Sequence, residues 1–223
     1  MLAEHTKKEF IEFLIGCNVL KFGEFITKSG RQTPYFINTG NFKTGRQLKI
    51  LGEFYAKQIN YFKNEIDVLF GPAYKGIPLV VCCCAALLNS FEVDMPFLFN
   101  RKEAKDHGEK GSFIGYMPKP NEKIAIVEDV LTAGTAINEV VPKIKQGFGS
   151  EINHLFIAVD RCEKKVNSEE LARNTLKQKF QIEVHSIVNI FDIRNFIENN
   201  VNFQDQLPRL DAYLKTYCIN QKS

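Results

Sequence analysis

The chain has 223 residues, 44% of them hydrophobic, and a formal net charge of +3. This length can bury a sizeable core in one large domain or two small ones, and the small charge gives no argument for nucleic acid or a membrane surface as partner. The six cysteines, three of them consecutive at 82–84 in an apolar run, indicate neither a disulfide framework nor a zinc site. The N-terminus is polar and no apolar run is long enough to span a bilayer, so we expect a cytoplasmic protein.

The N-terminal half alternates helical and extended patterns. Apolar residues at helical spacing predict helices over 6–18 and 46–61, while glycines and a proline among aromatics predict short strands and turns over 21–41. A strand over 67–70, a buried helix over 77–88 and a strand over 97–100 follow.

The C-terminal half repeats a strand–helix order. It predicts strands over 124–127, 155–159 and 184–188, and helices over 135–146, 168–180, 190–199 and 204–217. Strands that alternate with helices indicate an α/β sheet that is largely parallel. Ligands bind such sheets beyond the carboxyl ends of the strands, where this chain places polar motifs at 71–75, 100–102, 128–136 and 160–161.

The most informative motif is the run I-A-I-V-E-D-V-L-T-A-G-T at 124–135. A buried strand leads to two adjacent carboxylates, Glu128 and Asp129, and then to a small, hydroxyl-rich turn before a helix. The free N–H groups and hydroxyls of such a turn suit a phosphate monoester. Carboxylates accept hydrogen bonds from the hydroxyls of a sugar diol. The motif therefore predicts a phosphate site beside a ribose site.

This arrangement resembles the phosphoribosyl-diphosphate (PRPP) loop of the type I phosphoribosyltransferases. The resemblance implies an α/β fold with a mainly parallel central sheet flanked by helices, in a single domain over 1–223 with a small N-terminal hood at about 20–45. It implies that Glu128 and Asp129 bind the ribose, although the family usually has two aspartates. It adds the loop residues Val130, Leu131, Thr132, Ala133, Gly134, Thr135 and Ala136 to the PRPP site.

A second motif is G-P-A-Y-K-G at 71–76. Its glycines and proline permit an unusual backbone, and Lys75 is a cation that can meet a diphosphate. Alone it is equally a tight turn with a solvated lysine. Tyr74 and Lys75 followed by G-I-P-L resemble the diphosphate loop of orotate phosphoribosyltransferases, which implies that both residues bind PRPP.

The third motif is R-K-E-A-K-D-H-G-E-K-G at 101–111, which by composition alone is typical of a solvated loop. Directly after a strand, it resembles the catalytic loop of orotate phosphoribosyltransferases, which reaches into the neighbouring subunit of a homodimer. The resemblance implies catalytic and PRPP-binding roles for Arg101, Lys102, Lys105 and His107. Cations that close over the leaving diphosphate would stabilise its developing charge.

Two further motifs point to the base. The segment K-S-G-R-Q-T-P-Y-F-I-N at 28–38 resembles the part of the hood that covers orotate, which implies contacts from Lys28, Phe36, Ile37 and also Thr132. It also implies that Lys28 contacts the diphosphate of PRPP. The family commonly has a second aromatic where this chain has Ile37. Arg161 follows a predicted strand, and the planar fork of an arginine suits a carboxylate. The resemblance implies that Arg161 holds the carboxylate of orotate.

Four motifs in family order, between residues 21 and 161, identify the chain as a member of the orotate phosphoribosyltransferases. The family implies transfer of ribose 5-phosphate from PRPP to N1 of orotate in pyrimidine synthesis. It also implies Mg²⁺ as cofactor, held mostly by PRPP oxygens and water, so no protein ligand is assigned. One alternative is a purine phosphoribosyltransferase, which would share the PRPP loop but not the base site. A PRPP-sensing, DNA-binding regulator is a more distant one, since we expect no nucleic-acid or membrane partner.

Overall fold

The computed structural model describes residues 2–27, 30–101, 112–131, 134–165 and 168–220. The helices are α1 (Glu4–Gly16), α2 (Gly45–Ile59), α3 (Gly76–Phe91), α4 (Thr135–Phe148), α5 (Ala172–Phe180), α6 (Ile190–Glu198) and α7 (Leu207–Tyr217). The strands are β1 (Leu20–Ile26), β2 (Gln32–Ile37), β3 (Val68–Gly71), β4 (Phe97–Asn100), β5 (Phe113–Gly115), β6 (Lys123–Leu131), β7 (Glu151–Asp160) and β8 (Glu183–Asn189). Short 3-10 helices are η1 (Thr39–Asn41), η2 (Asn60–Glu65) and η4 (Val201–Gln206).

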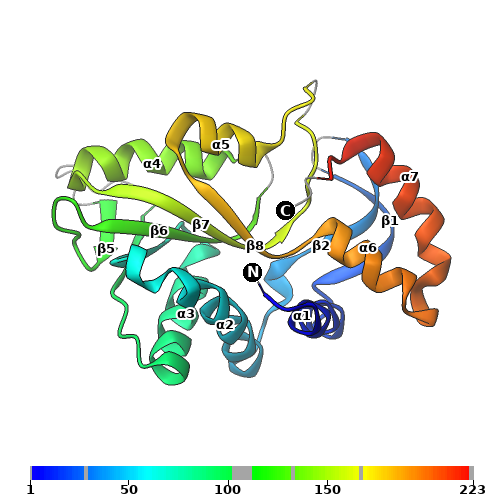
Figure 1. Ribbon diagram of the computed structural model, residues 1–223, viewed down its shortest axis with the longest axis horizontal. Coiled ribbons are helices and arrows are strands. Elements are labelled where there is room, and N and C mark those ends of the chain that lie inside the picture. The colour runs from blue at the N-terminus through cyan, green and yellow to red at the C-terminus, as the bar shows by residue number, and fades with distance from the viewer. Residues whose placement is uncertain (1, 28–29, 102–111, 132–133, 166–167, 221–223) are drawn as a thin grey trace.

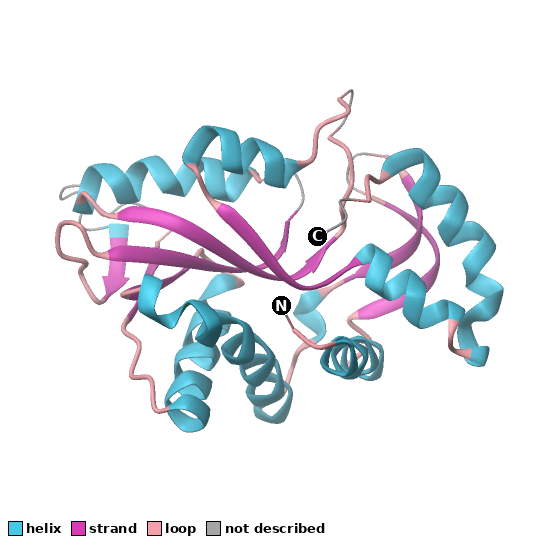
Figure 2. Cartoon of the chain, in the orientation of Figure 1, coloured by secondary structure: helices cyan, strands magenta, loops and turns pink. Residues whose placement is uncertain are grey.

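The central sheet has the strand order β5-β4-β3-β6-β7-β8. Figure 2 shows its strands in magenta with helices in cyan above and below them. All neighbouring strands in it are parallel except β5, which pairs antiparallel with β4 at one edge. Its inner strands are apolar on both faces, as expected where helices cover both sides. This confirms the predicted α/β fold with a mainly parallel sheet.

Helices form a layer on each face of the sheet, with α2 and α3 on one and α4 and α5 on the other (Figure 1). The alternation along β6 explains the two layers, because successive side chains of a strand point to opposite faces. Ala125 and Val127 belong to the core cluster that contains α2 and α3. Ile124 and Ile126 belong to the cluster that contains α4 and α5.

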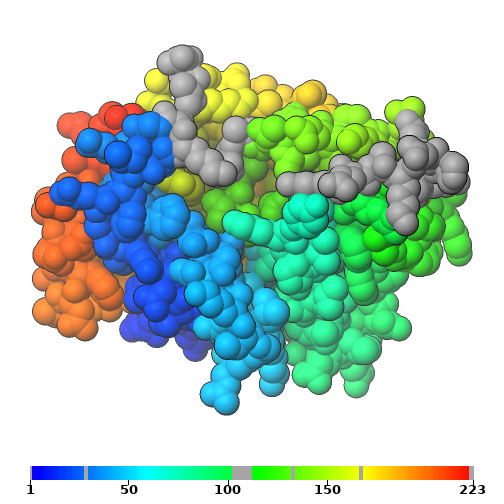
Figure 3. Space-filling view, turned by 180° about the vertical axis from the view of Figure 1, so that it is seen from behind, coloured from blue at the N-terminus to red at the C-terminus, as the bar shows by residue number. Residues whose placement is uncertain are grey.

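A separate two-stranded antiparallel sheet, β1 and β2, forms the hood. It packs against the C-terminal helices, which Figure 3 shows in orange and red beside the blue hood. The rings of Phe22 and Phe203 lie 5.5 Å apart, and those of Tyr35 and Tyr213 lie 5.8 Å apart. The hood is thereby fixed to the end of the molecule beside the carboxyl ends of the strands.

The predicted elements differ from the structure at several bounds, and one strand was missed. The central strand does not end at Val127 but continues to Leu131, because β7 keeps pairing with it as far as Asp160 after β3 has stopped at Gly71. The acids Glu128 and Asp129 therefore lie within a strand. The helix predicted over 168–180 begins at Ala172, and the short edge strand β5 was not predicted.

Candidate active site

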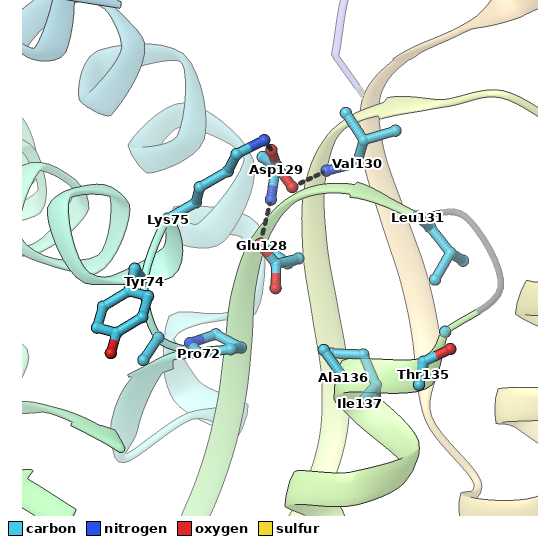
Figure 4. A pocket seen from close by; sticks show the side chains of 12 residues that line it. Pro72, Tyr74, Lys75, Glu128, Asp129, Val130, Leu131, Thr135, Ala136 and Ile137 are labelled. Atoms are coloured by element: carbon cyan, nitrogen blue, oxygen red, sulfur yellow. Dashed lines mark hydrogen bonds and ion pairs between the residues drawn. The ribbon is translucent and has the colours of Figure 1, made fainter. Parts of the chain in front are cut away.

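A cavity of about 510 Å³ opens where two neighbouring strands, β3 and β6, end (Figure 4). One wall is the loop between β3 and α3, and the other is the end of β6 with the start of α4. The lining residues are Pro72, Ala73, Tyr74, Lys75, Glu128, Asp129, Val130, Leu131, Gly134, Thr135, Ala136 and Ile137. The structure thus brings together two motifs that lie more than fifty residues apart in the sequence, as predicted.

The first wall depends on two glycines in van der Waals contact. A Cβ on Gly71 would lie 2.2 Å from the carbonyl oxygen of Gly76, and one on Gly76 would lie 2.7 Å from Cδ of Pro72. No larger residue fits at either position without a backbone shift. The side chain of Asn100 at the end of β4 accepts a hydrogen bond from the N–H of Ala73 at 2.9 Å, and the Ala73–Tyr74 peptide bond is cis. These contacts fix the loop that presents Lys75 to the cavity.

Asp129 is the centre of a small polar cluster with Lys75 and Thr39. Its Oδ2 lies 3.0 Å from Nζ of Lys75 and accepts a short hydrogen bond from the Thr39 hydroxyl, which itself lies 3.2 Å from the same Nζ. Its Oδ1 accepts from the N–H of Val130 at 2.8 Å. The cluster joins the hood side of the molecule, at η1, to both walls of the cavity. Thr39 was not predicted from the sequence.

The two adjacent acids differ in pKa. Burial and the neighbouring charge of Asp129 raise the pKa of Glu128 to about 8. Burial also acts against ionisation of Asp129, but the hydrogen bond from Thr39 and the charge of Lys75 outweigh it and lower the pKa of Asp129. At neutral pH the pair therefore carries about one negative charge, located on Asp129. Such a pair can both accept and donate hydrogen bonds to a diol.

Two helix N-termini meet at the cavity. Helix α4 starts at Thr135 after Gly134, whose φ of +72° suits glycine, and α3 starts at Gly76 directly after Lys75. The first N–H groups of a helix attract anions, and so does the positive end of its dipole. In α3 the N–H groups of Gly76 and Ile77 already donate to the carbonyl oxygens of Pro72 and Tyr74, so α3 contributes through its dipole. A ligand with a phosphate at each end matches this pair of positions.

Arg161 follows β7 and contacts the hood rather than the cavity. Its Nε donates to Oε1 of Glu163 at 2.9 Å and to the Tyr35 hydroxyl at 3.1 Å, and its guanidinium lies over the Tyr35 ring at 5.0 Å. Burial lowers the pKa of Arg161, but Tyr35 and Glu163 outweigh it and raise that pKa above the usual value. Arg161 is thus a buried cation that is held in place and stays charged.

The predicted hood residues lie on two sides of β2. Tyr35 and Ile37 pack towards the core, whereas the Phe36 ring is partly exposed and stacks on Phe25 at 5.4 Å. Since adjacent strand residues point to opposite faces, the rings of Phe36 and Tyr35 do not share a surface. A stacking role of Phe36 on the base stays a prediction.

Six predicted site residues lie outside the described part of the chain: Lys28, Lys102, Lys105, His107, Thr132 and Ala133. Arg101, which directly precedes the loop residues Lys102, Lys105 and His107, is described, and its N–H donates to the carbonyl oxygen of Ser112 at 2.7 Å. Residues 101 and 112, at the two ends of the predicted catalytic loop, are therefore neighbours at the end of β4.

The chemistry of the cavity fits a hard divalent cation only in part. Glu128 and Asp129 supply carboxylate oxygens, the donors that Mg²⁺ prefers. Within the described residues there is no group of three or more His, Cys, Asp or Glu side chains placed to hold a metal. An ion there would take most of its ligands from substrate and water.

Among the described residues, no helix has the length and apolar character needed to cross a membrane.

A mainly parallel sheet that brings an acid pair, the start of α4 and a lysine loop together at adjacent strand ends is the arrangement expected of a phosphoribosyltransferase. The family model described as "Phosphoribosyl transferase domain" matches residues 38–190. The chain is 45% identical to the orotate phosphoribosyltransferase of Clostridium beijerinckii over 218 residues, which cover 95% of this chain and 97% of that protein. It is 49% identical to that of Pasteurella multocida over 216 residues, covering 97% and 99%. The chain belongs to the orotate phosphoribosyltransferase family.

Solved structures agree with this assignment. The crystal structure of the orotate phosphoribosyltransferase of Francisella tularensis superposes with a TM-score of 0.84 at 38% identity, covering 95% of this chain and 100% of that one. A Mycobacterium tuberculosis orotate phosphoribosyltransferase in complex with PRPP has a TM-score of 0.59 at 13% identity over 86% of this chain and 93% of that one, a likeness of fold alone.

Proposed function

We propose that the protein transfers ribose 5-phosphate from PRPP to N1 of orotate, with orotidine 5′-monophosphate and diphosphate as products. The observation that carries this proposal is the cavity at the ends of β3 and β6. It places a cation, an acid pair and two helix N-termini around a space suited to a sugar with phosphates at both ends. The similarity to orotate phosphoribosyltransferases over nearly the whole chain supports orotate as the base.

PRPP is expected to lie across the cavity with its ribose on the acid pair. The α4 wall, from Val130 to Ala136, would bind the 5-phosphate, and the α3 wall with Tyr74 and Lys75 would bind the diphosphate. Asp129 is ionised and would accept hydrogen bonds from ribose hydroxyls. Lys75, which now pairs with Asp129, would then neutralise diphosphate oxygens instead.

The reaction needs positioning and electrostatic stabilisation more than covalent help from the protein. As the bond between C1 and the diphosphate breaks, positive charge develops on the ribose and negative charge on the leaving group. Lys75 would counter the negative charge, together with the loop residues Arg101, Lys102, Lys105 and His107. Mg²⁺, when bound, would add charge neutralisation at the diphosphate, with Glu128 and Asp129 as the nearby carboxylates.

Orotate carries a carboxylate, and Arg161 is a buried cation at the adjacent strand end. We assign the recognition of that carboxylate to Arg161, with Lys28, Phe36, Ile37 and Thr132 around the base. An arginine at this position would favour orotate over bases that lack the group.

The protein is further proposed to act as a homodimer, with loop 101–111 shared across the interface. Val81 and Leu88, seven residues apart and therefore on one face of α3, have exposed fractions of 44% and 52%. A second copy of the chain would cover them. Light scattering after gel filtration gives the mass, and a monomer at micromolar concentration would contradict this part of the proposal.

The assay that tests the proposal follows orotate absorbance with PRPP and Mg²⁺, with adenine, guanine and hypoxanthine in parallel. Loss of orotate that requires both PRPP and Mg²⁺ is the expected result. Turnover of a purine but not of orotate would keep the PRPP site and reject the base assignment. No turnover of any base would reject the enzyme.

A further inference from the structure

Glu163, which the reaction scheme above does not use, lies at the centre of a largely buried polar cluster around Arg161. Its Oε1 accepts hydrogen bonds from the hydroxyls of Tyr35 at 2.9 Å and Tyr213 at 2.7 Å and from Nε of Arg161 at 2.9 Å. Its Oε2 lies 3.6 Å from Nη1 of Arg31. We call Glu163, Arg161, Arg31, Tyr35 and Tyr213 the Glu163 cluster. It joins the hood, the end of β7 and helix α7.

Glu163 engages only one edge of the Arg161 guanidinium. Nε and Nη2, which form the side edge, lie 2.9 and 2.7 Å from the same oxygen, Oε1. The Nη2 contact has the distance of an ion pair but not hydrogen-bond geometry, and this buried atom has no other hydrogen-bond partner among the described residues. Nη2 is enclosed beside Glu163, whereas Nη1, the other terminal nitrogen, has no hydrogen-bond partner among the described residues and keeps its donors for another acceptor.

The charges in the cluster do not balance. Two guanidinium groups face one carboxylate, and the side chains of Arg31, Arg161 and Glu163 have exposed fractions of only 15%, 14% and 19%. Both phenols stay neutral donors, since burial raises the pKa of Tyr35 and raises that of Tyr213 to about 12. A buried excess of one positive charge is costly until an anion arrives. A ligand carboxylate would restore neutrality.

We propose that Glu163 is a positioning residue for base recognition, which holds the side edge of Arg161 so that its free end binds the carboxylate of the substrate base. Tyr35 and Tyr213 fix Glu163 in turn, so these two side chains, one from the hood and one from α7, contribute to specificity without touching the base. The proposal rests on the proposed function, because it needs a base that carries a carboxylate.

The test is Glu163→Gln, which keeps the shape of the side chain and removes its charge. The expected result is a rise of about 10-fold or more in KM for orotate, with KM for PRPP changed less than about 2-fold. The decisive readout is the ratio of kcat/KM for orotate to that for uracil, the same base without its carboxylate. We expect this ratio to fall about 10-fold, because only the carboxylate contact is misaligned.

One further variant tests the same contact, and a second controls for structural damage. Tyr213→Phe removes one hydroxyl that orients Glu163, and it should shift the same ratio in the same direction by about 2- to 5-fold. Glu198→Gln removes a carboxylate that pairs with Arg194 on α6, and it should leave the ratio unchanged. Thermal unfolding and circular dichroism on each variant report whether the fold persists.

An unchanged ratio in Glu163→Gln, or equal losses for orotate, uracil and PRPP, would overturn the positioning role. The proposed function is tested separately, since failure of the unmodified protein to use orotate would reject it whatever the variant does.

Discussion

The raised pKa of Glu128 predicts that this residue reduces the stability of the folded protein at alkaline pH. A shift from 4.5 to about 8 means that the folded protein holds a proton which the unfolded chain has lost. Stability from this group is therefore fully present below pH 4.5 and is lost as the pH rises through about 8. Glu128→Gln removes the titration while keeping the size of the side chain.

The magnitude follows from the size of the shift. At pH 8.5 the full shift corresponds to about 5 kcal/mol, and solvent in the open cavity and coupling to Asp129 reduce the expected value to about 2 kcal/mol. At pH 5 the gain should be below about 1 kcal/mol, because Glu128 is then protonated in the folded protein and partly so in the unfolded chain.

Urea unfolding of both proteins at pH 5 and pH 8.5 measures this difference. Comparing variant with parent at each pH cancels the titration of the groups that are not coupled to Glu128. Asp129→Asn is the matched control within the pair. Because the pKa of Asp129 is lowered, its charge stabilises the fold at neutral pH, and the variant should lose about 1–2 kcal/mol at pH 7. A gain from Glu128→Gln that is equal at both pH values, or a loss at pH 8.5, would refute the reasoning.

Three other predictions concern the reaction and the far end of the sheet. Lys105→Ala should lower kcat by about two orders of magnitude with the fold intact, and an unchanged kcat would remove the loop from the mechanism. Arg161→Ala should raise KM for orotate far more than KM for PRPP, so equal effects would contradict a base-specific role. Burial and His154, which contacts it at 3.0 Å, lower the pKa of His185 to about 4. Its contribution to stability is thus present above pH 6.5 and lost as the pH falls towards 4. The loss of unfolding free energy between pH 7 and pH 4 is the acid limb of the stability curve. In His185→Gln this loss should be smaller by about 1 kcal/mol, measured by urea unfolding. An acid limb that is the same in both proteins would exclude His185 as its cause.

The lining of the cavity could be predicted because its signals are local. Glu128 and Asp129 stand next to each other, and Gly134 and Thr135 follow within one turn, so strand, acids and helix start can be read in order. Lys75 likewise lies between Gly71 and Gly76, whose backbones are too close together for any side chain at either position. Placing both motifs at the same edge needed only the rule that parallel strands end together.

The partners of these residues could not be predicted, because nothing near them in sequence signals the contact. Thr39 lies 90 residues from Asp129 and stands in an ordinary N-T-G turn. Tyr213 lies 50 residues from Glu163 on an amphipathic helix, where an aromatic residue is typical of a core position. The end of β6 was missed for a similar reason, since pairing with β7 overrides the polarity of the acids.

The hydrogen bond between Tyr35 and Glu163 closes a loop of 128 residues, and those from Thr39 and Lys75 to Asp129 close loops of 90 and 54. Contacts between residues so far apart in the sequence are slow to form, because the chain loses conformational entropy in closing the loop before the contact stabilises it. Secondary structure and a collapsed core can be regained without them. Recovery of catalysis after dilution from denaturant is therefore a stricter measure of native topology in this protein than recovery of its helical circular dichroism signal.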